Sequence, residues 1–394
     1  MLDRRSFLLG SGAILLAGCS DRTREALKVQ LLNGSIPRQL IGEFRSLSAS
    51  GQPAKFTPIA QLADNFKLLQ DWQQIAKGEK SISRFPNWVP FVGNHIPPSA
   101  NLVTLGDTWL AEAIRDRLIQ PLNPSQLKGW QNLPEAFTQV VTRNKAGFVD
   151  KKGEVWGAPY RWGSTVIAYN QAVFKNLDWT PQDWEDLWRE ELRDRISIIQ
   201  QPREIIGLTL KKLGHSYNTK DLKAIPNLQQ ELEALVKQIK FYSSTNYLQP
   251  LILKDTWVAV GWSTDILPTI KRYPQLKVVV PKSGTSLWCD LWVKPETINN
   301  NNNTISLLSD RWIDFCWQDR SAQKISLFSD AVSPMLLKAK RSDLPKPLQE
   351  SSPIFPDRAI IDKSEFIEPL PQPILAQYQE IFAGLKSSKA GNKY

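Results

Sequence analysis

Residues 155–170 constrain the fold of this chain most, because they read as one extended segment that crosses between two parts of the molecule. Pro159 fixes its own φ and pushes Ala158 into an extended conformation, and Gly157 and Gly163 permit turns on either side. From residue 164 to 169 the run is β-branched and apolar, which predicts a buried strand. The sequence therefore predicts a crossing strand between two lobes.

Tyr160 and Trp162 come just before this predicted strand. Ligand clefts commonly form between domains, so both aromatic side chains are candidates for a cleft wall. The alternative is an ordinary core strand in which the tryptophan packs against apolar neighbours. This stretch alone leaves both interpretations open.

Length and composition narrow the class of protein. The 394 residues exceed one ordinary core and favour two domains, and 42% hydrophobic with 22% charged residues is typical of a soluble globular protein. The 15 tryptophans suit sites for sugars or amines, although most are expected in the core. The net charge of +10 is scattered along the chain, which argues against nucleic-acid binding. Neither His95 nor His215 has a second histidine at ligand spacing, so we expect no metal and no cofactor.

The N-terminus carries an export pattern. Arg4 and Arg5 precede an apolar run from Phe7 to Ala17, which matches a twin-arginine signal and is too short to span a membrane. The run ends in Leu-Ala-Gly-Cys19, a pattern that resembles the lipobox at which bacterial lipoproteins are acylated and cut. Residues 1–19 therefore predict a signal peptide that leaves a lipid-anchored periplasmic protein, with residues 20–26 as a tether.

The order of elements predicts the fold class. Strands at 27–32, 54–58 and 101–107 alternate with helices at 37–47, 59–78 and 108–119. This alternation indicates an α/β lobe with a sheet rich in parallel strands. A ligand would lie at the carboxyl ends of those strands, beside loops 32–36 and 106–109.

A second lobe follows the crossing strand. We expect a helix with Thr180 as its N-cap, a strand at 195–200, a helix from Pro202 to Gly214 and a return crossing at 276–281. Cys289 and Cys316 are either free thiols or one disulfide. The predicted division is 27–157 with 279–334 for the first lobe, 158–278 with 335–386 for the second, and a frayed tail at 387–394.

Two acids and two indoles form the candidate binding set. Asp290 lies in an apolar run with no adjacent base, which is unfavourable unless it meets a cation, and Trp288 shares its face of the strand. Trp262 ends another strand, and Glu204 lies in the first turn of a helix, where the dipole favours a carboxylate. Together they suit an ammonium ligand. Taken singly, each indole could be core and Glu204 an ordinary helix-start acid.

From Leu27 to about Leu385 the chain resembles the spermidine/putrescine-binding proteins of bacterial ABC importers. The stretches that carry this resemblance are 158–165, 184–188, 203–204, 210–219, 262–263 and 288–290. It implies a two-lobed periplasmic-binding-protein fold of type II, with no enzymatic activity, that captures a small cationic solute by lobe closure and delivers it to a permease. By position it implies amine contacts from Glu204 and Asp290, a slot lined by Trp262 and Trp288, and further contacts from Ser244, Gln201, Trp109 and Asn33.

Several positions depart from the pattern of that family. Leu32 and Ser35 replace an aromatic pair, Asn33 replaces a threonine, Gln201 replaces an aspartate and Ala331 replaces a tyrosine. Each lost aromatic contact weakens amine binding by about 1–2 kcal/mol, so the ligand is either a polyamine held differently or another small solute. Two other classes stay open: a glycosidase with an Asp/Glu pair, and a sensory or assembly lipoprotein that keeps only the fold.

Overall fold

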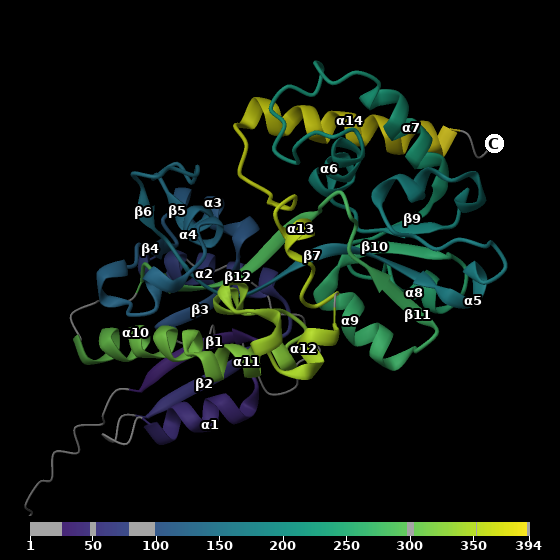
Figure 1. The fold of residues 1–394 in the computed structure, drawn as a ribbon. Coiled ribbons are helices and arrows are strands. Elements are labelled where there is room, and N and C mark those ends of the chain that lie inside the picture. The colour runs from purple at the N-terminus through teal and green to yellow at the C-terminus, as the bar shows by residue number, and fades with distance from the viewer. Residues whose placement is uncertain (1–25, 48–52, 79–98, 298–302, 352, 392–394) are drawn as a thin grey trace, which may run out of the picture.

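The computed structural model describes residues 26–47, 53–78, 99–297, 303–351 and 353–391. Within these ranges one long strand, β7 (Ala158–Asn170), joins two hydrophobic cores (Figure 1). Its first half pairs antiparallel with β12 (Ser286–Pro295), and its second half pairs with β10 (Val258–Trp262) and β11 (Leu276–Val279). β7 is therefore the crossing strand that the sequence predicts.

The first lobe is built on a sheet in the order β2, β1, β3, β12. β1 (Leu27–Leu32) pairs in parallel with β2 (Ala54–Ile59) and β3 (Leu102–Gly106), as the alternation of strands and helices predicts. Its other elements are α1 (Arg38–Leu47), α2 (Leu62–Ala76), α3 (Asp107–Arg115), β4 (Ile119–Gln120), α4 (Glu135–Val141), β5 (Thr142–Arg143), β6 (Glu154–Val155), α10 (Asn303–Trp317), α11 (Asp319–Phe328) and α12 (Lys346–Glu350).

The second lobe continues the same sheet through β10, β8 (Ile196–Ile198) and β9 (Ile239–Tyr242). Its helices are α5 (Gln171–Phe174), α6 (Pro202–Lys212), α7 (Leu228–Gln238), α8 (Gln249–Ile252), α9 (Ser263–Arg272) and α14 (Gln372–Gly391). The C-terminal α14 packs along α6 and α7 (Figure 1). Gly214 closes α6 at a φ of +78°, which explains why the sequence places a glycine at that helix end.

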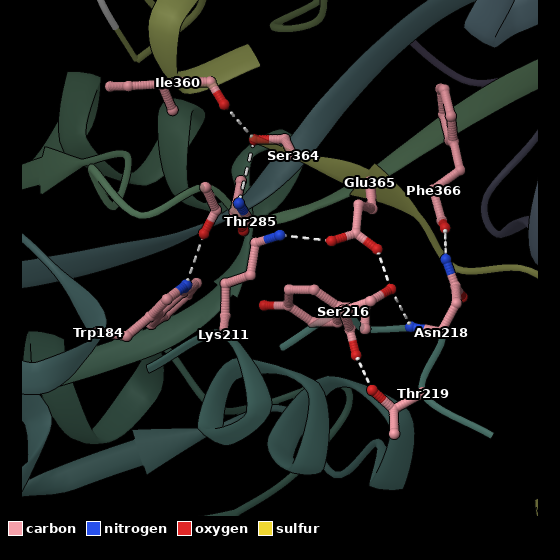
Figure 2. A network of polar contacts seen from close by, with 12 residues as sticks. Trp184, Lys211, Ser216, Asn218, Thr219, Thr285, Ile360, Ser364, Glu365 and Phe366 are labelled. Atoms are coloured by element: carbon pink, nitrogen blue, oxygen red, sulfur yellow. Dashed lines mark hydrogen bonds and ion pairs between the residues drawn. The ribbon is translucent and has the colours of Figure 1, made fainter. Parts of the chain in front are cut away.

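A third connection between the lobes comes from residues 358–368, which contain α13 (Arg358–Ile361) and β13 (Glu365–Phe366). β13 pairs with the start of β12, while Glu365 forms an ion pair with Lys211 of α6 (Figure 2). The Asn218 amide donates to the carbonyl of Phe366 at 2.9 Å. This segment is thus bonded to the first-lobe strand and to the second-lobe helix at once.

Three boundaries differ from the sequence prediction. Leu336, Leu344, Leu348 and Phe355 pack in the core of the first lobe, so the part of 335–386 that precedes α13 does not lie in the second lobe core. The predicted frayed tail is helical as far as Gly391, because α14 extends beyond its apolar stripe. The helix predicted to start at Thr180 is instead a 3₁₀ helix, Trp184–Trp188, and it starts after Asp183 because the Asp183 and Asp186 carboxylates form the capping box there.

Cys289 and Cys316 are buried free thiols, which settles the alternative that the sequence left open. Each belongs to the core of the first lobe. Among the residues that the structure describes, no helix has the length and hydropathy needed to cross a membrane.

Candidate functional site

Six residues of β7 and β12, five with side chains and one a glycine, share one face of the ribbon that joins the lobes, and we call this surface the ribbon face. In the register of the two strands, Asp290 lies opposite Arg161 and Trp288 lies opposite Gly163. One step further, the hydroxyl groups of Thr165 and Ser286 meet at the same carboxylate. Because side chains alternate along a strand, these three pairs lie in a row along the ribbon.

Glu204 lies at the second-lobe end of this row. α6 places it in the first helical turn, after Pro202 at the helix start. Its Oε1 accepts from the Thr165 hydroxyl at 3.0 Å and its Oε2 from the Ser286 hydroxyl at 2.5 Å, and the Trp262 indole also bonds to it. Burial raises the pKa of Glu204, and these three donors together with the charge of the neighbouring Arg203 oppose that rise. In the described part of the chain no lysine, arginine or histidine forms an ion pair with this carboxylate.

Of the two indoles in the predicted set, Trp262 lies beside the Glu204 carboxylate and Trp288 lies further along the row. Trp262 ends β10 opposite Thr165, and both Trp262 and Trp288 are half-buried. Trp288 packs directly on Gly163, where an added Cβ would come 2.4 Å from the ring. Glycine at 163 thus allows the indole to approach the backbone of the crossing strand closely.

Asp290 lies at the first-lobe end of the row, and its cation is supplied by the protein. The Arg161 Nε lies 2.6 Å from the Asp290 Oδ2, with the two residues 3% and 1% exposed. Arg161 also donates to the Ser329 carbonyl at 3.0 Å, and its guanidinium carbon lies 5.9 Å from the Trp288 ring centroid. Burial raises the pKa of Asp290 while Arg161 opposes that rise, and the same contact raises the pKa of Arg161.

This pairing corrects the premise that Asp290 has no protein cation. The sequence interpretation looked for a base near Asp290 along the chain, whereas Arg161 approaches from the neighbouring strand. Arg161, Thr165 and Ser286 are the residues that the interpretation missed. The available signal was one basic residue, Arg161, and one acidic residue, Asp290, each inside a buried apolar strand. Two such strands are expected to pair so that the buried charges meet.

The remaining predicted contacts divide between the two lobes. Ser244 is half-buried, and its hydroxyl donates to the Gln200 carbonyl at 3.3 Å, while Gln201 is exposed at the start of α6. Both thus lie near the helix start that carries Glu204. Asn33 is exposed after β1, and Trp109 of α3 stacks on Phe66 with ring centroids 4.7 Å apart.

Tyr160 belongs to the core of the first lobe, so its interpretation as a cleft wall is wrong. Trp162 packs in the same core and also lines a cavity whose walls include Leu287 of β12 and Ser216 of the second lobe. Tyr160 stacks on Trp292 with ring centroids 4.5 Å apart, and both of these side chains are fully buried. Trp162 packs edge-on against Phe137. The alternative of an ordinary core residue is the one that the structure supports for Tyr160. Within the described ranges, no group of three or more metal-ligating side chains is close enough to hold a metal ion.

Comparison with known families identifies the chain. A family model described as bacterial extracellular solute-binding protein matches residues 98–364. The chain belongs to this family of solute-binding proteins. Its members bind solutes for ABC transporters and are not enzymes, so the glycosidase alternative is not supported. The matched range includes β7 and β12, which carry the ribbon face, and β10, which carries Trp262.

Relatives of this solute-binding protein include the spermidine/putrescine-binding periplasmic protein of Salmonella typhimurium, at 25% identity over 73% of this chain and 78% of the relative. A putrescine/cadaverine-binding protein of Pseudomonas aeruginosa is 29% identical over 47% of this chain and 55% of its own. A solved spermidine/putrescine transporter substrate-binding protein from Streptococcus pneumoniae has the same two-lobed fold, with a TM-score of 0.73, 20% identity, and coverage of 92% of this chain and 99% of the other.

Proposed function

We propose that this protein is the lipid-anchored substrate-binding component of an ABC importer and that it captures a small solute bearing an ammonium group. Lobe closure around the bound solute would shift the protein to the form that docks on the permease. The family and the polyamine-binding relatives support this function class.

The observation that carries the ligand class is the buried carboxylate of Glu204, which forms no ion pair with a described residue although the charge of Arg203 acts on it. It is buried and accepts hydrogen bonds from neutral hydroxyl and indole groups rather than from a cation of the described chain. A buried carboxylate without a counter-ion is unfavourable, and an ammonium group would supply both charge and donors. The half-buried Trp262 beside it offers a ring face for the cation or its methylene groups.

Thermal unfolding of the chain from residue 20 onward tests this proposal. We expect the melting temperature to rise with the concentration of at least one amine from a panel of monoamines, diamines and polyamines. Sugars and dicarboxylates serve as matched controls and should cause no shift. The Glu204→Gln variant keeps the size of the side chain and should lose the amine response. A wild-type protein that ignores every amine in the panel would refute the ligand class.

The export and anchoring proposal rests on residues 4–19, which lie outside the described residues. Labelling cells with an alkyne fatty acid should mark the wild-type protein and leave Cys19→Ala unlabelled. Replacing Arg4 and Arg5 with lysine should retain the protein in the cytoplasm. Labelling that persists without the thiol would contradict lipidation at Cys19.

A further inference from the structure

Arg161 lies at the first-lobe end of the ribbon face, where it pairs with Asp290. The geometry points to Arg161 as a specificity-determining residue that takes the place of a ligand cation, so that the preferred solute has its ammonium at Glu204 and an uncharged far end. This inference rests on the proposed function and names the solute class more narrowly.

The two acids, Asp290 and Glu204, lie at opposite ends of the ribbon face. Arg161 and Asp290 form one pair across β7 and β12, and the hydroxyl groups that hold Glu204 form a pair two steps along the same face. At about 3.3 Å per residue, these pairs are about 13 Å apart, with Trp288 between them. A long diamine placed along this face would bring one ammonium to each acid.

Of the two acids, only Asp290 forms an ion pair, whereas Glu204 is influenced by the charge of Arg203 without bonding to it. Asp290 has the Arg161 guanidinium 2.6 Å away, whereas Glu204 has only neutral donors among the described residues. Arg161 is also anchored by the Ser329 carbonyl at 3.0 Å, so two acceptors hold it in place. The position that a second ammonium would need beside Asp290 is therefore filled by the protein.

Buried charged groups set the electric field at the first-lobe end of the ribbon face. The Arg161 guanidinium lies beside the Trp288 ring, and burial keeps water away from both members of the ion pair. Asp265 of α9 also faces Arg161, but the Tyr247 hydroxyl donates to it at 3.1 Å and burial raises its pKa. A ligand cation brought to this place would have to compete with Arg161 for the Asp290 carboxylate and would lie beside the guanidinium at low dielectric, whereas an amide or hydroxyl group would not.

The test uses two probes with the same eight-carbon chain, 1,8-diaminooctane and its mono-N-acetyl derivative, in which an uncharged acetamide replaces the far-end ammonium. Binding is measured by calorimetry and by thermal shift. Wild-type protein is expected to bind the acetylated probe at least about tenfold more tightly than the diamine. Arg161→Met removes the cation but keeps an unbranched apolar stem, so this variant is expected to reverse the preference by a similar factor.

A second variant keeps the test decisive if Arg161→Met does not fold, because that change leaves Asp290 without a partner. The double variant Arg161→Met with Asp290→Asn removes both charges and should bind the two probes with affinities equal within about threefold. A wild-type protein that binds the diamine as tightly as the acetylated probe overturns the role of Arg161 but leaves the proposed function standing. Absence of binding to either probe, and to the amine panel, by wild-type protein overturns both.

Discussion

Arg161 and Asp290 lie opposite each other on the two strands that join the lobes, with Nε and Oδ2 2.6 Å apart and both side chains buried. Each strand would otherwise hold an uncompensated charge inside a core. The pair therefore fixes the register of β7 against β12 as well as the charge of the ribbon face, since a one-residue slip would separate the two groups.

Breaking this pair should cost more than removing it. We expect Arg161→Ala to lower the free energy of unfolding by about 3–5 kcal/mol, because it leaves the Asp290 carboxylate buried without a cation. Arg161→Met with Asp290→Asn should recover most of that loss. Urea denaturation of the three proteins checks this, and equal losses in the single and double variants would show that the ion pair itself matters little.

Amine binding should strengthen as pH rises in the acidic range. Burial raises the pKa of Glu204, so a fraction of the molecules keeps this carboxyl protonated at pH values above the ordinary glutamate pKa. An alkyl ammonium stays charged over the same pH range. The amine-induced shift in melting temperature should therefore grow from pH 4.5 to pH 8. Glu204→Gln removes the titrating group and should show no such trend, and a shift that shrinks with pH in the wild type would contradict this assignment.

Gly163 should tolerate no side chain. A Cβ there would come 2.4 Å from both the Trp288 ring and the Ser263 hydroxyl, so Gly163→Ala must displace one of them. We expect a loss of about 1–3 kcal/mol in stability together with loss of ligand response. Gly42→Ala in α1, where nothing lies within 4 Å, is the matched control and should be neutral or stabilising. Two variants with the same melting temperature would argue against this packing.

The Asp107 carboxyl should make the protein less stable as the solution becomes less acidic. Burial raises the pKa of Asp107 to about 7, and its Oδ1 accepts the Cys289 amide at 3.0 Å. A raised folded-state pKa stabilises the fold fully below the unfolded value, and this contribution is lost as pH rises to about 7. Wild-type protein should lose up to about 1.4 kcal/mol per pH unit more than Asp107→Asn between pH 5 and 7. Parallel pH profiles in urea denaturation would show that Asp107 is not the group responsible.

The two buried thiols should be unreactive in the folded protein. Burial raises the pKa of both Cys289 and Cys316, so neither forms a thiolate at neutral pH. A chain that begins at residue 20 should show no reaction with Ellman's reagent in buffer and two reactive thiols in guanidinium. Rapid reaction of either thiol under native conditions would place it at the surface, and Cys316→Ala distinguishes the two.

The sequence by itself determined the strand–helix order, the crossing strand at 155–170 and the set of acids and indoles, because these depend on local periodicity and on residue type. β1 spans the predicted residues 27–32, and Glu204 lies in the first turn of α6, as local helix signals require. The stretches that carry the family resemblance are also short and contiguous in the sequence.

Only the tertiary structure decided what each charged side chain meets. Arg161 and Asp290 are 129 residues apart in the chain, and strand register brings them together. Thr165 and Ser286 reach Glu204 from different strands, while Tyr160 and Trp162 are withdrawn into the core. A buried charge is paired through space rather than along the chain, so the sequence could name the carboxylates of the site but not show which of them already has its cation.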